Sequence, residues 1–267
     1  TNCPAPKLES RKTISLDKAI TEDVTFKGCQ GSLISAYLVS PLTPKQEKRP
    51  AILYVHWYDP RVANSNRDEF LNEAKRMAQQ GAVSLLVSTF WSVPGGTYHE
   101  RRWQNDYQNT LNQTQDLLHA ANLLRSFKNE VDETRIAYVG HDYGASFGAL
   151  VAGIDGKIKG FALEAGTPRL TDWYSYGSAS GTPKGEEAKQ FIASFKAIEP
   201  EVMIAKTKAK ILLQYANDDP FITPENAQAL QKAAPKDTVF KTYNTTHAMD
   251  LPQIETDRRE WLTQLLW

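Results

Sequence analysis

Short apolar runs alternate along this sequence with longer segments whose apolar residues recur at helical spacing. The runs at 51–56 and 82–89 are largely apolar, which is typical of strands buried on both faces of a sheet. Between them, 66–80 gathers its apolar side chains on one helical face. Strands that alternate with helices form βαβ units, which build a mainly parallel sheet with right-handed crossovers. The pattern therefore predicts an α/β fold with helices flanking the sheet.

The remaining strands and helices follow the same two patterns. Further strands are expected at 13–26 (one or two strands), 31–40, 134–140, 158–165, 209–216 and 238–243, and further helices at 103–124, 142–153, 186–195, 224–234 and 257–267. No helical segment separates the first strands, so we expect them to be antiparallel.

One segment, 167–208, interrupts this alternation because it contains no strand pattern. It includes an irregular stretch at 177–185. Long excursions in a compact domain are usually functional or mobile. We interpret this one as a small lid over the strand ends, and a surface insertion without a role is the alternative.

The balance of charge limits the possible partners. Lysine plus arginine and aspartate plus glutamate each number 31, so the chain lacks the net field that collects nucleic acid or anionic membrane. Its apolar runs are strand-length and shorter than the roughly eighteen residues of a membrane span. We see neither a nucleotide-binding loop nor a Cys/His cluster with metal spacing. We expect a small-molecule substrate, no nucleic acid, no membrane span, no cofactor and no metal, and the oligomeric state stays open.

Both cysteines, Cys3 and Cys29, lie near the N-terminus. A disulfide between them would fit an exported protein, and two unrelated free thiols are the alternative. The sequence begins at Thr1 without methionine, as after removal of a signal peptide or trimming of the chain. We therefore expect a periplasmic or secreted protein, with a cytoplasmic one as the alternative. We divide it into an N-terminal arm with the first strand at 1–30 and one domain at 31–267.

The segment 135–148, RIAYVGHDYGASFG, joins an apolar strand to a helix of small residues. Gly140 and Gly144 flank Asp142 at two positions' distance on either side. Glycine permits both the strained turn and the close approach of helix to sheet that such a junction requires. The spacing therefore places the turn at Asp142.

Ser146 also lies between two glycines and is an alternative centre for the turn. A turn there would extend the strand through His141 and Asp142 and bury both at a high desolvation cost. The apolar run ends at Val139, so Asp142 is favoured. We expect Ser146 to be packed one helical turn further along.

This junction resembles the nucleophile elbow of the α/β-hydrolase superfamily. Within that superfamily the chain is similar, from about Gly31 to the C-terminus, to bacterial proteins grouped with the dienelactone hydrolases. The similarity is carried by DEFLNEAKRMAQQGAVSLL, RIAYVGHDYGASFGALVAG and FALEAGTPRLTDWY. It implies the α/β-hydrolase fold, with an eight-stranded, mainly parallel sheet. The chain departs from the dienelactone hydrolases at the nucleophile, which is cysteine in them and Asp142 here.

The elbow Gly-His-Asp-aromatic-Gly is similar instead to that of epoxide hydrolases and haloalkane dehalogenases. In those families the aspartate attacks carbon and forms an ester, and a histidine activates the water that hydrolyses it. A carboxylate is ionised at neutral pH and needs no base to become a nucleophile. It suits displacement at an alkyl carbon, and it suits acyl transfer poorly because a mixed anhydride would have to form.

In α/β-hydrolases an acid and a histidine follow the nucleophile in that order. Asp219 stands in a turn directly after a strand, and His247 stands just after the next strand. Asp142, Asp219 and His247 are therefore the candidate catalytic residues. Asp218 is the alternative acid, and Glu164 is a competing partner for His247.

The resemblance also implies two backbone N–H groups that stabilise negative charge in the transition state. Tyr143, the residue after the nucleophile, is expected to supply one. Tyr58, two residues beyond the strand end at His56, is expected to supply the other. Trp57 lies beside it and is a candidate substrate-binding residue.

Two tyrosines of the excursion, Tyr174 and Tyr176, are further candidates for substrate binding. Epoxide hydrolases protonate the ring oxygen with lid tyrosines, and ordinary packing is the alternative here. Arg101 and Arg102 are interpreted as solvated surface charges, with a carboxylate-binding role as the alternative. His99 and His141 lie near the site without a defined role. An aromatic pocket is expected from Trp57, Tyr58, Trp91, Tyr98 and Trp173.

Three functions remain open. The first is hydrolysis of a small epoxide or alkyl halide through an ester of Asp142. The second is hydrolysis of an ester or lactone, as in the dienelactone hydrolases, with a substituted nucleophile. The third is a non-catalytic relative that binds a ligand or partner. The presence of both Asp219 and His247 argues against the third.

Overall fold

The computed structural model describes residues 3–43, 47–59, 66–92, 101–176 and 182–267. Within them one sheet has the strand order β1-β2-β3-β5-β4-β6-β7-β8-β9. Its strands are β1 (Leu8–Ser15), β2 (Ile20–Lys27), β3 (Leu33–Ser40), β4 (Arg49–Val55), β5 (Val83–Val87), β6 (Val131–His141), β7 (Gly160–Glu164), β8 (Lys210–Ala216) and β9 (Val239–Tyr243). β1, β2, β3 and β5 pair antiparallel, and all pairs from β5 through β9 are parallel. The expected α/β fold and the antiparallel start of the sheet are confirmed.

The described part of the sheet has nine strands, one more than the eight expected. The segment expected as one or two strands at 13–26 divides into β1 and β2, because the chain reverses around Lys18, where φ is +59°. β1 also begins earlier than expected, at Leu8, and pairs only with β2 at the edge of the sheet. Its mostly exposed, polar side chains form no apolar run, so the hydrophobic pattern did not reveal it.

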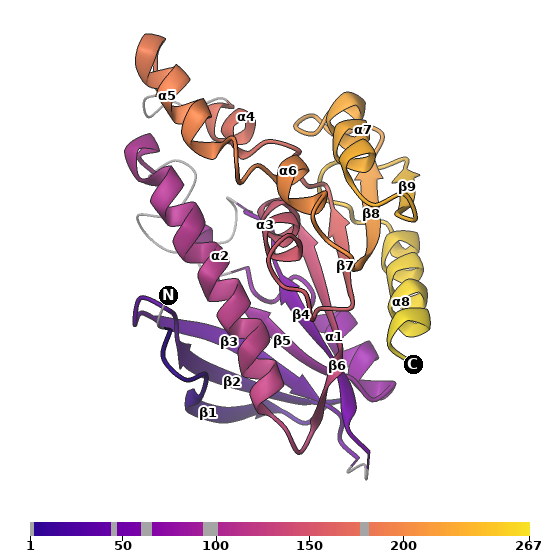
Figure 1. The fold of residues 1–267 in the computed structure, drawn as a ribbon. Coiled ribbons are helices and arrows are strands. Elements are labelled where there is room, and N and C mark those ends of the chain that lie inside the picture. Colours follow the sequence, from indigo (N-terminus) through magenta and orange to yellow (C-terminus); the bar gives the residue numbers. More distant parts are fainter. Residues whose placement is uncertain (1–2, 44–46, 60–65, 93–100, 177–181) are drawn as a thin grey trace.

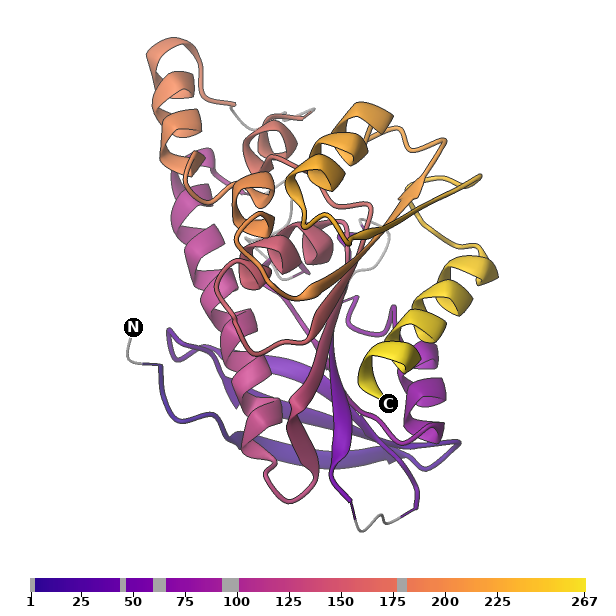
Figure 2. The same cartoon turned by 45° about the vertical axis from the view of Figure 1, so that its right-hand side comes forward.

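Helices cover both faces of the sheet (Figures 1 and 2). α2 (Trp103–Ser126) and α3 (Tyr143–Ala152) pack on one face, and α1 (Leu71–Gln79) and α8 (Pro252–Leu266) pack on the other. Successive residues of β4 show the division. Leu53 belongs to the core beneath α2 and α3, whereas Ile52 belongs to the core beneath α1 and α8. α8 begins earlier than the expected 257, since proline at position 252 is well suited to a first helical turn.

The excursion at 167–208 carries α4 (Leu170–Ser175), α5 (Gly185–Phe195) and α6 (Pro200–Ile204) in its described residues. α7 (Pro224–Ala233) follows β8. α4 and α5 lie beyond the carboxyl ends of the central strands, near the start of α2 (Figure 1). The expected irregular stretch at 177–185 falls largely outside the described residues. A lid role for the excursion stays a prediction.

The N-terminal arm is tied to the body of the fold by the expected disulfide between Cys3 and Cys29. The main-chain N–H of Cys29 donates to a carboxylate oxygen of Asp116 on α2 at 2.7 Å. The bridge therefore anchors the arm at a point that α2 also holds. Across the described ranges, no helix combines the length and the apolarity needed to cross a membrane.

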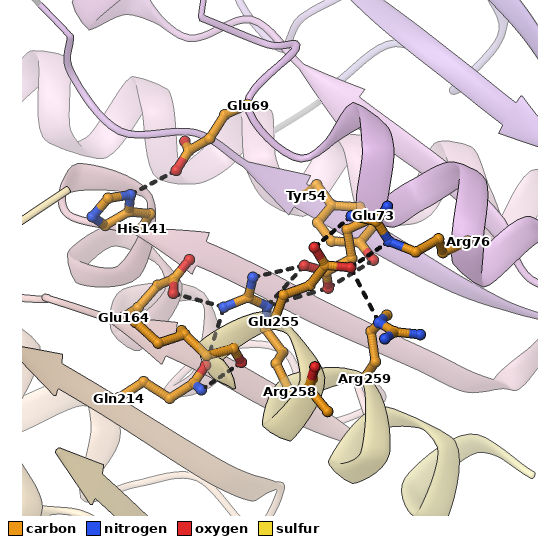
Figure 3. Close-up of polar contacts among 12 residues, drawn as sticks. Tyr54, Glu69, Glu73, Arg76, His141, Glu164, Gln214, Glu255, Arg258 and Arg259 are labelled. Atoms are coloured by element: carbon orange, nitrogen blue, oxygen red, sulfur yellow. Dashed lines mark hydrogen bonds and ion pairs between the residues drawn. The ribbon is translucent and has the colours of Figure 1, made fainter. Parts of the chain in front are cut away.

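A buried ion-pair network joins α8 to α1 and to the sheet (Figure 3). The guanidinium of Arg258 donates to Glu73 of α1 and to Glu164 at the end of β7, each at 2.6 Å, and to Gln214 of β8 at 3.1 Å. Arg258 and both acids are almost fully buried. Burial raises the pKa of each carboxyl group, and the positive charge of Arg258 opposes that effect. One arginine thus offsets the burial of two acids.

Replacing Arg258 with alanine is expected to lower the free energy of unfolding by about 3–5 kcal/mol, because Glu73 and Glu164 would lose their buried partner. Urea denaturation followed by circular dichroism measures the change. Arg259→Ala is the matched control, because that arginine meets Glu255 at 3.1 Å in a partly exposed pair and is expected to cost about 1 kcal/mol or less. Equal losses in the two variants would contradict the role given to Arg258.

Candidate functional site

Asp142 occupies the turn between β6 and α3. Its φ of +53° lies in the left-handed region, which is strained for a residue with a side chain. A Cβ on Gly144 would lie 2.1 Å from the carbonyl oxygen of Val55, so glycine is required where α3 meets β4. Gly140 is similarly constrained, since a Cβ there would lie 2.3 Å from the carbonyl oxygen of Gly144. The strand-to-helix turn is therefore at Asp142, where the glycine spacing placed it.

Ser146, the alternative centre, is buried one helical turn along α3. Its hydroxyl donates to the main-chain carbonyl of Asp142 at 2.8 Å and accepts from the main-chain N–H of Thr167 at 3.0 Å. These bonds link the turn to the segment that follows β7. Ser146 is thus packed, as expected, and holds the fold together at this point.

The structure brings the three candidate catalytic residues together. Nδ1 of His247 donates to Oδ2 of Asp219 at 2.7 Å, and Nε2 of His247 lies 3.7 Å from Oδ1 of Asp142. All three side chains are buried. The other oxygen of Asp219 accepts main-chain N–H groups from Phe221 and Ile222, at 2.8 and 3.0 Å. The acid is therefore held from two sides while it orients the imidazole.

The competing acids are placed elsewhere. Asp218 is exposed, and its main-chain N–H donates to the carbonyl of Thr245 at 3.1 Å. Glu164 is paired with Arg258. Within the described residues, Asp219 is the candidate acid that accepts a hydrogen bond from His247.

The two aspartates control the charge of His247. Burial lowers the pKa of its imidazole, but the contacts and negative charges of Asp142 and Asp219 outweigh burial and raise that pKa to about 9. The pKa of the Asp219 carboxyl group is lowered. Burial raises this pKa, but the hydrogen bond and charge of His247 and the two main-chain N–H groups lower it by more. The imidazolium form of His247 is therefore favoured at neutral pH.

The main-chain N–H of Tyr58 donates to Oδ2 of Asp142 at 3.3 Å. One carboxylate oxygen therefore faces the loop after β4, and the other faces His247. Tyr143 is the first residue of α3, and its buried ring stacks on Trp91 with centroids 5.2 Å apart. A role for the N–H of Tyr143 in stabilising an oxyanion stays a prediction.

Aromatic side chains surround His247. The indole of Trp173 on α4 stacks on the imidazole at 5.9 Å, the ring of Phe221 meets it edge-on at 5.1 Å, and Trp57 lies 5.9 Å away. Phe221 was not anticipated from the sequence, although it stands two residues after Asp219. Of the five residues expected to form an aromatic pocket, Trp57 and Trp173 lie beside the imidazole. The pocket itself stays a prediction.

The two tyrosines of the excursion lie in different environments. The buried hydroxyl of Tyr174 hydrogen-bonds Thr110 of α2 at 2.9 Å. Tyr176 is 48% exposed, and its ring stacks on Trp173 at 6.2 Å. Each side chain thus has a packing contact, and a role in proton donation stays a prediction.

Arg101 differs from its expectation. It is buried and forms an ion pair with Asp106 of α2, and its guanidinium lies 5.0 Å from the ring centre of Tyr174. The interpretation as a solvated charge is wrong because Asp106, one turn into α2, compensates the burial. Arg102 is exposed, as expected. Tyr98 and His99 lie outside the described residues.

Three side chains near Asp142 carry atoms of the kinds that bind metal ions. Glu69, His141 and Glu164 each place one ligand atom within 4.8 Å of the others. Two of these donors already bind each other, since Nδ1 of His141 lies 2.6 Å from Oε1 of Glu69. Glu164 is held by Arg258. The sequence pattern assigns no role to His141 or to Glu69.

Comparison with known proteins gives a structural match and no sequence match. No family model matches the chain, and no curated protein matches it. An acetyl xylan esterase from Paenibacillus sp. R4 superposes with a TM-score of 0.80 at 17% identity, over 97% of this chain and 90% of the esterase. Acetyl xylan esterase 1 from Thermoanaerobacterium sp. JW/SL YS485 gives a TM-score of 0.76 at 17% identity, over 98% and 89% of the two chains.

A protein of Klebsiella pneumoniae assigned as a dienelactone hydrolase is also similar. Its TM-score is 0.66 at 14% identity, over 93% of this chain and 98% of that one. Identities this low establish the fold alone. The fold is that of the α/β-hydrolases, as the resemblance implied.

Replacing Asp142 with asparagine is expected to lower the pKa of His247 from about 9 toward that of an ordinary histidine. The amide keeps the shape of the carboxylate and removes its charge, so one of the two contacts that favour imidazolium is weakened. NMR titration of the His247 ring measures the pKa. The exposed Asp218→Asn variant is the control and should leave that pKa unchanged. An equal pKa in wild type and Asp142→Asn would show that the two side chains are not coupled.

Proposed function

We propose that this protein is a hydrolase in which Asp142 attacks a carbon electrophile, a small alkyl halide or epoxide, and forms an alkyl ester with it. The observation that carries the proposal is the placement of the Asp142 carboxylate. It occupies a strained strand-to-helix turn, receives the N–H of Tyr58 on one oxygen and faces Nε2 of His247 with the other. A group in this position is set up to react and then to be regenerated.

The first step forms a bond between Oδ1 of Asp142 and the substrate carbon. The bond from that carbon to the leaving group breaks, and the leaving group takes its electron pair as halide or alkoxide. Oδ2 becomes the carbonyl oxygen of the new ester and keeps the N–H of Tyr58 at 3.3 Å. Halide needs no proton, whereas an alkoxide takes one from solvent or from a neighbouring acid.

The second step hydrolyses the ester. Water attacks Cγ of Asp142 and loses a proton to Nε2 of His247, and Asp219 stabilises the imidazolium that results. Negative charge develops on Oδ2, where the N–H of Tyr58 already points. The bond from Cγ to the alkyl oxygen then breaks, and the alcohol leaves with the proton that His247 holds. The Asp142 carboxyl group, which keeps the other hydrogen of the attacking water, releases it as a proton and returns to the carboxylate.

The charge of the site changes in the order that these steps require. His247 is protonated in the free protein because Asp142 and Asp219 raise its pKa to about 9. Alkylation converts Asp142 into a neutral ester and removes one of those charges. The pKa of His247 then falls, and the imidazolium releases its proton to the departing alkoxide or to solvent. The neutral imidazole is then the base when a water molecule must be activated.

A second candidate is the hydrolysis of esters by direct attack of water. The named structural neighbours support it more directly than they support the first candidate, because two of them are acetyl xylan esterases. In this mechanism His247 takes a proton from water, and the N–H of Tyr58 would turn to the substrate carbonyl. Asp142 forms no covalent bond. The side chain at the turn, a carboxylate in place of serine or cysteine, favours the first candidate.

The two candidates predict different fates for solvent oxygen. In a single turnover in heavy-oxygen water, an alkyl halide or epoxide substrate is expected to leave label in Asp142, because the attacking water enters at its Cγ. Mass spectrometry of the Asp142 peptide measures the label. His247→Gln should accumulate the alkyl ester, detectable as added mass on the same peptide, because the base for the second step is missing.

Asp142→Asn should abolish the turnover, and the exposed Asp218→Asn should leave it intact. Turnover without label in Asp142 would exclude the alkyl-ester route.

The candidates also differ in their dependence on pH. Hydrolysis of an aryl ester by direct water attack needs neutral His247, so its rate should rise with pH until the pKa of about 9 is passed. Alkylation of Asp142 uses no general base, so its single-turnover rate should not rise with the loss of the His247 proton. Stopped-flow rates across this range measure both. Ester turnover already at its maximum at neutral pH would contradict the water-attack mechanism.

A further inference from the structure

His141, directly before Asp142, is fully buried and has an oxygen at each ring nitrogen. Nδ1 lies 2.6 Å from Oε1 of Glu69, and Nε2 lies 2.8 Å from the main-chain carbonyl oxygen of His247. Figure 3 shows Glu69 and His141 facing each other, apart from the Arg258 network. A carbonyl and a carboxylate are both acceptors, and a neutral imidazole has one N–H. A neutral imidazole beside a carboxylate can therefore form only one of the two hydrogen bonds. Both form only when His141 and Glu69 together hold one additional proton.

Contacts of the pair place that proton on His141. The second oxygen of Glu69 accepts the main-chain N–H of Trp57 at 2.8 Å, which favours the carboxylate. The indole of Trp57 stacks on the imidazole at 5.0 Å with the rings 11° apart, a position that attracts a cation. Both contacts therefore favour placing the proton on His141.

The charges around His141 come from several elements. Glu69 precedes α1, Glu164 ends β7, and His247 follows β9. Burial lowers the pKa of His141, and the negative charges of Glu69 and Glu164 raise it by more, against an opposing effect of His247. Asp142 is the next residue in the chain, and Arg258 and Glu73 lie behind Glu164.

The pair connects three segments that the reaction needs. Glu69 holds Trp57, whose neighbour Tyr58 donates to Asp142. His141 belongs to the turn and holds the carbonyl of His247. We propose that Glu69 and His141 form a charged pair that positions the Tyr58 N–H and the His247 imidazole around Asp142. The role of the pair in catalysis rests on the proposed function. The charge of the pair rests on its hydrogen bonds and does not depend on that function.

The charge is tested without substrate. Nitrogen-15 NMR of the histidine rings, assigned with His141→Gln, is expected to show both nitrogens of His141 protonated at a pH well above the usual histidine pKa. His56 is the internal contrast, because burial lowers its pKa to about 4 and keeps it neutral. In Glu69→Gln the amide can donate to Nδ1, so the His141 signal should become that of a neutral ring. A neutral His141 in the wild type would overturn the charged pair.

The positioning role is tested by kinetics of the wild type and three variants. Glu69→Ala is expected to lower kcat roughly 10- to 100-fold with little change in KM, because reacting groups are displaced while substrate contacts remain. Glu69→Gln, which can keep both hydrogen bonds, should restore part of the loss. Glu255→Gln is the matched control and should match the wild type, because Glu255 binds Arg76 and touches neither loop.

Different measurements decide the reaction of Asp142 and the charge of His141. Absence of label in Asp142 during turnover would reject the proposed function, and the ring-nitrogen spectrum would still decide the charge of His141. With label present in Asp142, a Glu69→Ala variant that folds and keeps kcat within about twofold of wild type would reject the positioning role.

Discussion

The close contact between α3 and β4 at the Asp142 turn is the constraint on which the rest of the site depends. Gly144 leaves no room for a side chain against the carbonyl of Val55, and Asp142, two residues earlier, takes a left-handed backbone conformation. Because β4 ends at this contact, the N–H of Tyr58 in the following loop reaches the carboxylate of Asp142. A looser junction would separate that donor from the group it serves.

The charged side chains around the Asp142 turn are largely buried. Charges in a region that excludes water interact strongly, so each one requires a partner. Asp142 and Asp219 lie on either side of His247, Glu69 lies against His141, and one arginine offsets two acids behind them. Removal of the Asp142 charge by alkylation would therefore be felt by His247, and this coupling gives the proposed two-step reaction its order.

The fold itself does not decide the chemistry. Acetyl xylan esterases share this architecture over nearly the whole chain, and one fold commonly carries several reactions. The carboxylate at the turn favours the alkyl-ester route, because a carboxylate can displace a leaving group from carbon but forms an acyl intermediate only through an anhydride. For that reason the proposed function rests on Asp142 and its contacts, and the similarity of fold supports the alternative reaction.

The sequence alone determined the α/β architecture, the turn at Asp142 and the order in which Asp219 and His247 follow, because apolar periodicity and glycine spacing are local patterns. The tertiary structure decided the rest. The polar edge strand β1 has no apolar run and exists through its pairing with β2. The pair of Glu69 and His141 joins residues 72 positions apart. No local pattern encodes such contacts, because the folding of the whole sheet brings them together.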